Sequence, residues 1–273
     1  MASSPSPPDR PLRLTARDRE MLAFLAEHRF ALAAHVGRTL GTSTRAAGRR
    51  LGTLRAAGLV RAARPLRHDP TAWAVTRRGL AACGSSLGVP RAVDLGLYRH
   101  DVGVAWLAAG ARRGTFGAVS EVVSERTMRS EDRRADRPGD APSHGIRIGH
   151  GSTARLHYPD LTVVTAGGHR IAFELELSTK SPRRRERIVA AYADDPRIDA
   201  VVYLVQTRAG AQAIARSAAR VGATDTVRVQ RFRWAGGRAP GEAARGEATR
   251  GTVAHRSQAT LRPTPPGRAG ASR

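Results

Sequence analysis

The arrangement of apolar and polar positions predicts three short helices followed by two strands in the first part of the chain. Thr15 and Asp18 fit a capping box, which favours the start of the first helix at this point. The apolar positions of that helix recur at helical spacing and are Met21, Leu22, Leu25 and Ala26. The remaining elements are expected at Ala31–Leu40, from Thr42 or Ser43 to about Ala57, at Leu59–Ala63 and at Ala72–Thr76.

Further along the chain, strands alternate with helices. A helix is expected over Ala92–Arg112, with most of its apolar side chains buried, among them Leu95 and Leu97. Ser130–Ser152 is polar and rich in Gly and Pro, so a long loop is expected there. The predicted strands are 116–123, 161–165, 171–177, 198–206 and 226–234, and the predicted helices are 182–194 and 209–221. The pattern therefore predicts an α/β protein.

One stretch, His157–Lys180, carries the acidic residues of interest. Its sequence is HYPDLTVVTAGGHRIAFELELSTK, and the Gly-Gly pair between two runs of strand formers predicts a β-hairpin. Glu174 and Glu176 are two residues apart on a strand, so their side chains point to the same face. Asp160 lies at the far end of the paired strand, so its distance from them depends on register and twist.

Three carboxylates at one end of a hairpin predict either an exposed cluster or a cation site. Like charges this close should raise at least one carboxylate pKa when no metal is bound. Mg²⁺ takes oxygen ligands, usually one or two carboxylates plus phosphate. Lys180 is the single lysine among 46 basic residues. It would reach the cluster only if the chain turned back at Ser178–Thr179, because four extended residues span roughly 13 Å.

Pro159-Asp160, the hairpin and the acidic pair together resemble the PD-(D/E)XK nuclease pattern. The chain departs from that pattern in having Glu176 where a lysine is usual. The resemblance implies an α/β domain with a mixed sheet and Mg²⁺ as cofactor. It implies that Asp160 and Glu174 hold the metal, that Glu176 orients or deprotonates a water, and that Lys180 or Arg184 steadies the phosphate.

Net charge changes the interpretation of the first part of the chain. The 273 residues carry a net charge of +23 with a pI near 11.7, which favours a polyanionic partner, most simply nucleic acid. The stretches TSTRAAGRRLGTLRAAGLV and TAWAVTRRG, in the order three helices and a hairpin, resemble a winged helix-turn-helix. That resemblance implies double-stranded DNA as partner, with the third helix in the major groove and the hairpin along the backbone.

The candidate DNA contacts are all arginines. Arg45 and Arg49 are expected to contact base edges or phosphates, and Arg50, Arg64 and Arg67 to contact phosphates. Arg184 is expected to hold phosphate at the start of the helix 182–194. The alternatives are that these arginines only solvate an amphipathic helix, or that the winged helix docks another protein.

The whole order of motifs resembles the replication-relaxation family of plasmids and integrated elements. It comprises the winged helix, YRHDVGVAWL, HYPD, FELELS-K and an Arg-rich helix, over roughly Leu12–Trp234. The resemblance implies a DNA-binding accessory of plasmid replication or mobilisation, with replication or mobilisation proteins as partners. Two alternatives stay open: a Mg²⁺-dependent endonuclease or nickase, and a winged-helix transcriptional regulator without catalysis.

The expected organisation is disordered residues 1–11, a winged helix over 12–90, a connecting helix over 91–114, a nuclease-like domain over 115–235 and a disordered basic tail over 236–273. One cysteine, Cys83, and the absence of an apolar leader or a long apolar run predict a cytoplasmic protein that does not span a membrane. The histidines His144, His150, His157 and His169 are too scattered to predict zinc. His100, alone on a mainly apolar helix, is assigned no chemistry.

Overall fold

A computed structural model describes residues 12–135, 141–149, 151, 154–178 and 180–233. The segments expected to be disordered, 1–11 and 236–273, lie outside the described residues. Within the described ranges, no helix has the length and apolar character needed to cross a membrane.

The N-terminal part forms three helices against a small antiparallel sheet with the strand order β1-β3-β2. Its elements are α1 (Ala16–Glu27), β1 (Ala31–Leu32), α2 (Ala33–Leu40), α3 (Thr44–Ala56), β2 (Val60–Ala63), β3 (Ala72–Val75) and α4 (Arg77–Ala82). The predicted capping box is confirmed, since the Thr15 N–H donates to Asp18 Oδ2 at 2.7 Å. Ser43 caps α3, and Gly58 with φ of 71° follows its end. The helix α2 begins two residues later than expected, because Ala31–Leu32 pairs with β3.

The connecting helix α5 (Tyr98–Ala111) starts six residues later than the expected Ala92. The Gly96 N–H donates to the Asp94 carboxylate at 2.8 Å, and this turn occupies residues that the sequence pattern assigned to the helix. The expected burial of Leu95 and Leu97 is also wrong, since these residues are 60% and 40% exposed.

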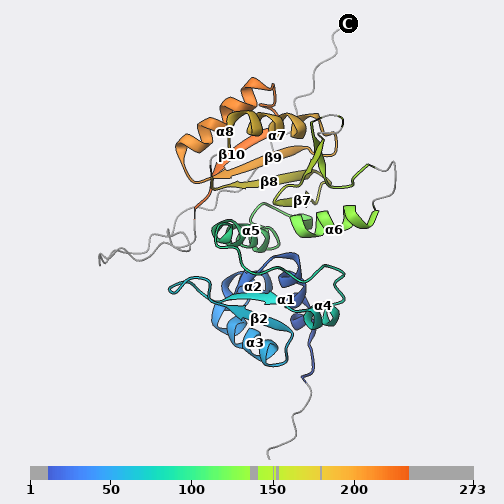
Figure 1. Cartoon of the computed structure of the whole chain (residues 1–273), viewed down its shortest axis with the longest axis vertical. Helices are drawn as coiled ribbons and strands as arrows, with labels where there is room; N and C mark the ends of the chain where they lie inside the picture. The colour runs from blue at the N-terminus through green and yellow to red at the C-terminus, as the bar shows by residue number, and fades with distance from the viewer. Residues whose placement is uncertain (1–11, 136–140, 150, 152–153, 179, 234–273) are drawn as a thin grey trace, which may run out of the picture.

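The C-terminal part is a five-stranded mixed sheet with the order β10-β9-β8-β7-β4, which confirms the α/β class. The strands are β4 (Val119–Ser124), β7 (Leu161–Thr165), β8 (Arg170–Glu176), β9 (Ala200–Val205) and β10 (Val227–Arg231). The strands β4, β7 and β8 are antiparallel neighbours, whereas β8, β9 and β10 run parallel. The parallel strands are connected by α7 (Pro182–Asp194) and α8 (Arg208–Arg220), which cover one face of the sheet (Figure 1).

The expected long loop over Ser130–Ser152 is wrong. Its first residues belong to α6 (Glu125–Ala135), and β5 (Ile146–Ile148) pairs with β6 (Arg155–His157) as a separate two-stranded sheet. Only Met128 and Asp132 of α6 are buried, so the helix has almost no apolar face for a sequence pattern to reveal. Asp132 anchors the segment that follows, since its carboxylate accepts the backbone N–H groups of Ser143, His144 and Gly145.

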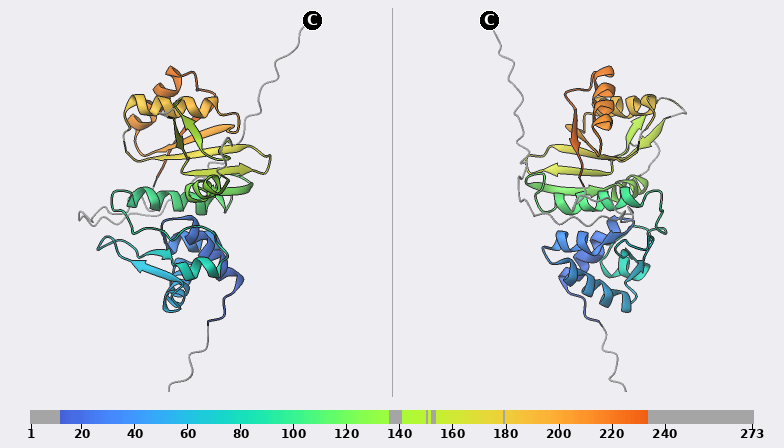
Figure 2. Two further views of the ribbon diagram at one scale, coloured as in Figure 1. Left: turned by 45° about the vertical axis from the view of Figure 1, so that its right-hand side comes forward. Right: turned by 90° about the vertical axis from the view of Figure 1, so that its left-hand side faces the viewer.

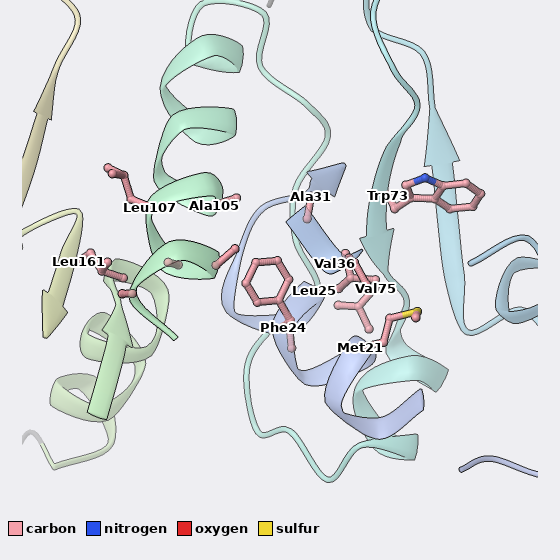
Figure 3. Packing of buried hydrophobic residues seen from close by; sticks show 14 of the residues in the cluster. Met21, Phe24, Leu25, Ala31, Val36, Trp73, Val75, Ala105, Leu107 and Leu161 are labelled. Atoms are coloured by element: carbon pink, nitrogen blue, oxygen red, sulfur yellow. The ribbon is translucent and has the colours of Figure 1, made fainter. Parts of the chain in front are cut away.

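Both parts of the chain share one hydrophobic core, with α5 between them (Figures 1 and 2). Figure 3 shows Ala105 on the side of α5 that faces Phe24 of α1, and Leu107 on the side that faces Leu161 of β7. All four residues are at most 7% exposed. The helix α5 therefore fixes the winged helix against the sheet.

Candidate functional site

The register of the hairpin brings Asp160 beside the two glutamates. Leu161 pairs with Phe173, so that Asp160, one residue before β7, lies level with Glu174 on the adjacent strand β8. The Leu175 N–H donates to Asp160 Oδ2 at 2.8 Å, which holds the carboxylate against β8. The register that the sequence left open thus places Asp160 within the acidic cluster.

Glu174 is buried, and its Oε1 accepts two hydrogen bonds. The Tyr192 hydroxyl of α7 donates at 2.5 Å, and His157 Nε2 lies 2.7 Å away. Burial alone would raise the pKa of Glu174, but the charge and hydrogen bond of His157, with Lys180 and Tyr192, outweigh it and lower the pKa to about 2. Glu174 is therefore not a carboxylate whose pKa is raised by the crowding, because nearby donors and cations compensate it.

Lys180 folds back onto the acidic cluster rather than continuing along the strand. Its Nζ lies 2.7 Å from Glu176 Oε2 and 3.8 Å from Glu174 Oε2. Burial alone would lower the pKa of Lys180, but the neighbouring carboxylates, Glu174 foremost, raise it. The backbone is supported by Arg185, whose Nη1 donates to the Lys180 carbonyl while its Nε donates to Ser217 of α8.

His100 was missed as a site residue. Its Nε2 lies 3.1 Å from Asp160 Oδ2, and its Nδ1 lies 3.7 Å from Asp101. Burial alone would lower the pKa of His100, but the hydrogen bonds and charges of the two aspartates outweigh it and raise the pKa to about 10. His100 and Asp160 are sixty residues apart, so the single sequence offered no sign of the contact beyond its place in the motif YRHDVGVAWL.

The four residues proposed from the hairpin, Asp160, Glu174, Glu176 and Lys180, are therefore together in space. Their carboxylates supply the hard oxygen atoms that Mg²⁺ prefers. In the present arrangement, however, each carboxylate already faces a basic side chain of the protein, namely His100, His157 or Lys180. Among the described residues, no group of three or more His, Cys, Asp or Glu side chains is arranged to hold a metal ion. This arrangement does not fit a magnesium site unless Lys180 and the histidines move.

The winged helix presents its arginines in two places. Arg45 and Arg49 are exposed on α3, one turn apart. Arg64 and Arg67 are exposed on the connection between β2 and β3, where Arg64 Nε lies 3.4 Å from the Thr71 hydroxyl. These four side chains are exposed to solvent, as the sequence pattern expects of a DNA-binding face.

Arg50 occupies a different position from its neighbours on α3. Its Nε and Nη2 each lie 2.6 Å from one oxygen of the Asp18 carboxylate, which forms a bidentate pair between α3 and α1. Burial would raise the pKa of Asp18, but the Arg50 hydrogen bond and the Thr15 cap outweigh it and lower the pKa to about 2. The geometry thus gives Arg50 a structural partner within the protein.

Arg184 is exposed at the start of α7, as expected. Figures 1 and 2 show α7 and α3 at opposite ends of the molecule, so Arg184 is separate from the winged-helix arginines. Its neighbour Arg185 is not a surface residue of this helix, because it is only 7% exposed and bonded to Ser217.

No protein-family model matches the chain, and no curated protein matches it. Among solved structures, the chain is similar to that of a mutant of Lactococcus lactis ZitR, at 21% identity and a TM-score of 0.24. The match covers 31% of this chain and spans 55% of that one, so about half the length of the neighbour is represented.

Proposed function

We propose that the chain is a DNA-binding protein that holds duplex DNA through its N-terminal winged helix. The observation that carries the proposal is the exposure of Arg45 and Arg49 on α3 and of Arg64 and Arg67 on the β2–β3 connection. In this mode α3 enters the major groove, where arginines contact guanine edges or phosphates, and the connection follows the backbone. The net charge of +23 supports a polyanionic partner.

The test is duplex binding measured by fluorescence anisotropy over a range of salt concentrations. Neutralised phosphates release counterions, so the affinity should fall steeply with salt. Changing Arg45 and Arg49 to Ala should cost about 1–3 kcal/mol for each base contact. The matched control is R208A/R216A, which removes the same charge from exposed positions of α8. Equal losses in the two double variants would contradict binding through α3.

A finer role follows from the resemblance to the replication-relaxation family. We propose that DNA binding serves plasmid or mobile-element replication or mobilisation in the cytoplasm, with proteins of those processes as partners. The alternative is a transcriptional regulator, which needs the same winged helix and no catalysis. A plasmid-maintenance assay separates them: a replication accessory is required for plasmid copy number even when transcription of the plasmid genes is supplied from another promoter.

A second candidate function is that of a Mg²⁺-dependent endonuclease or nickase. The gathering of Asp160, Glu174, Glu176 and Lys180 at one end of the hairpin favours it. The pairing of those carboxylates with His100, His157 and Lys180 argues against a preformed metal site, so we assign no catalytic step. The test is to incubate supercoiled plasmid with the protein and Mg²⁺. Nicking by the wild type that is lost in D160N and E174Q would support the nuclease function. Absence of nicking by the wild type would exclude it.

A further inference from the structure

A groove of about 490 Å³ lies where the segment between α4 and α5 passes along α6. Figure 1 shows this segment between α4 and α6 at one side of the molecule. The groove is bounded by five arginines and only two carboxylates, and these seven residues are Arg29, Arg91, Arg126, Arg129, Arg133, Asp94 and Glu125. Its lining therefore carries an excess of positive charge.

Two of the five arginines are neutralised within the protein. Arg29 pairs with Asp101 at 3.4 Å, and Arg129 pairs with Glu125 at 2.8 Å. In the part of the chain that the structure describes, the other three arginines form no ion pair with a carboxylate, and they are Arg91, Arg126 and Arg133. The groove thus holds three arginines without an ion pair against one further lining carboxylate, Asp94, so its lining keeps an excess of positive charge.

Arg126 is held rigidly among these charges. Its Nε donates to the Ala26 carbonyl at 3.1 Å and its Nη2 to the Gly88 carbonyl at 2.6 Å. Burial lowers the pKa of Arg126, and the like charges of Arg29 and Arg133 lower it further. The two carbonyl groups take two of the five N–H donors of Arg126 and carry no net charge, so an anion bound in the groove could accept from the remaining donors and would relieve the repulsion.

The groove also has an apolar side. Val89 and Leu97 line it and are 44% and 40% exposed, although both are large apolar residues. The outer surface of a duplex presents phosphates and sugars, whereas an unpaired strand presents base faces as well as phosphates. Cations beside exposed apolar side chains are therefore better matched to a single strand than to a duplex.

The groove adjoins a small cavity that is lined by one residue of the acidic cluster, Asp160. This cavity shares Arg29, Glu125 and Arg126 with the groove and is also lined by His100. The groove therefore adjoins the cavity that is lined by the His100–Asp160 pair.

We propose that this groove binds single-stranded DNA, with Arg91, Arg126 and Arg133 on phosphates and Val89 and Leu97 against the bases. It would be a second DNA site, separate from α3, and it rests on the proposed function only in taking DNA as the ligand. A chain with both sites would hold duplex on the winged helix and an unpaired extension in the groove.

The experiment compares a blunt duplex of about 20 base pairs with the same duplex carrying a single-stranded extension of about 10 nucleotides. The groove variant is R91A/R133A, which leaves Arg126 and its contacts to Ala26 and Gly88 intact. The matched control is R208A/R216A on α8. All proteins are compared at one fixed salt concentration, and thermal unfolding checks that each variant is folded.

The extension should strengthen binding to the wild type, and R91A/R133A should lose about ten-fold in affinity for the extended probe while keeping its affinity for the blunt one. No gain from the extension in the wild type would overturn the proposal. An equal loss on both probes would also overturn it, since the groove would then hold duplex or act only through overall charge, and R208A/R216A distinguishes those two causes. A third outcome separates the two proposals. If R45A/R49A leaves blunt-duplex binding unchanged while R91A/R133A abolishes the extra affinity for the extended probe, single-strand binding in the groove is supported and the proposed role of α3 is wrong.

Discussion

His100 Nε2 and Asp160 Oδ2 are 3.1 Å apart, which joins the start of α5 to the start of β7 by a charged hydrogen bond. The same oxygen accepts the Leu175 N–H of β8 at 2.8 Å. The Asp160 carboxylate therefore links α5, the helix that packs against the winged helix, to strands β7 and β8 of the sheet. The first prediction concerns its contact with His100.

Replacing His100 by Gln should lower the free energy of unfolding by about 1.5–3 kcal/mol at pH 6, because a hydrogen bond between charged groups is lost. The folded-state pKa of His100 is raised to about 10 from a usual value of 6.5. Its contribution is therefore fully present below pH 6.5 and is lost as the pH rises to about 10. Urea unfolding of both proteins at pH 6, 8 and 10 measures this, with His169→Gln as the exposed control. A difference that grows with pH would contradict the assignment.

Replacing Asp18 by Ala should destabilise the protein by about 2–4 kcal/mol, since it removes the side-chain half of the capping box of α1 and the bidentate partner of Arg50. The folded-state pKa of Asp18 is lowered to about 2 from 3.8. Its contribution is present above pH 3.8 and is lost as the pH falls through about 2. Chemical unfolding at pH 7 and pH 3 measures the loss.

Substitution of Arg50 should affect stability, whereas substitution of Arg45 and Arg49 should affect DNA affinity. R50A should lower the melting temperature by several degrees because Asp18 loses its charged partner. R45A/R49A should lower duplex affinity and leave the melting temperature within about one degree, since both side chains are exposed. If R50A melted like the wild type, the Asp18–Arg50 pair would have no structural role.

Replacing Tyr192 by Phe should destabilise the protein by about 1.5–3 kcal/mol at pH 7, because ionised Glu174 loses the hydroxyl that donates to it. The folded-state pKa of Glu174 is about 2, so this loss should be present at neutral pH and shrink as the pH falls from 4.5 to about 2.

Tyr203→Phe is the matched control for that experiment. The Tyr203 hydroxyl is buried and has no hydrogen-bond partner among the described residues. Removing it should leave stability unchanged or slightly higher, since an unsatisfied buried polar group is removed. Similar losses in the two variants would show that ring packing, and not the bond to Glu174, accounts for the Tyr192 effect.

Lys180 and Glu176 should be energetically coupled. A double-mutant cycle with K180M and E176Q should give a coupling energy of about 1 kcal/mol, because each single change leaves a mostly buried charge without its partner. K180R should retain most of the stability, since the charge is kept. Urea unfolding of the four proteins measures the coupling, and a value below about 0.3 kcal/mol would mean that the ion pair is absent in solution.

The parts of the fold that sequence patterns predicted depend on interactions between near neighbours. The Thr15–Asp18 cap spans three residues, and the hairpin turn needs Gly168, whose φ of 82° suits glycine. Likewise, the burial of Ile188, Val189 and Tyr192 follows directly from helical spacing in α7.

The parts that were missed depend on distant partners or on very small apolar faces. Arg50 finds Asp18 across 32 residues, so a pattern on α3 alone presented it as one more surface arginine. His100 finds Asp160 across 60 residues. The helix α6 buries only Met128 and Asp132, and its polar composition resembles a loop. Such pairs cannot be predicted from one sequence, because the identity of a residue does not determine which distant residue it contacts in the fold.

The position of α5 between α1 and β7 decides how this protein can be dissected in the laboratory. A fragment ending near Pro90 would leave Phe24 facing water where Ala105 covers it, and a fragment beginning near Thr115 would do the same to Leu161. Neither fragment has a complete hydrophobic core. A loss of DNA binding in a truncated protein would therefore reflect misfolding rather than the removal of a binding site. Assigning DNA binding to α3, to the groove beside α6 or to both therefore requires single side-chain changes in the intact chain.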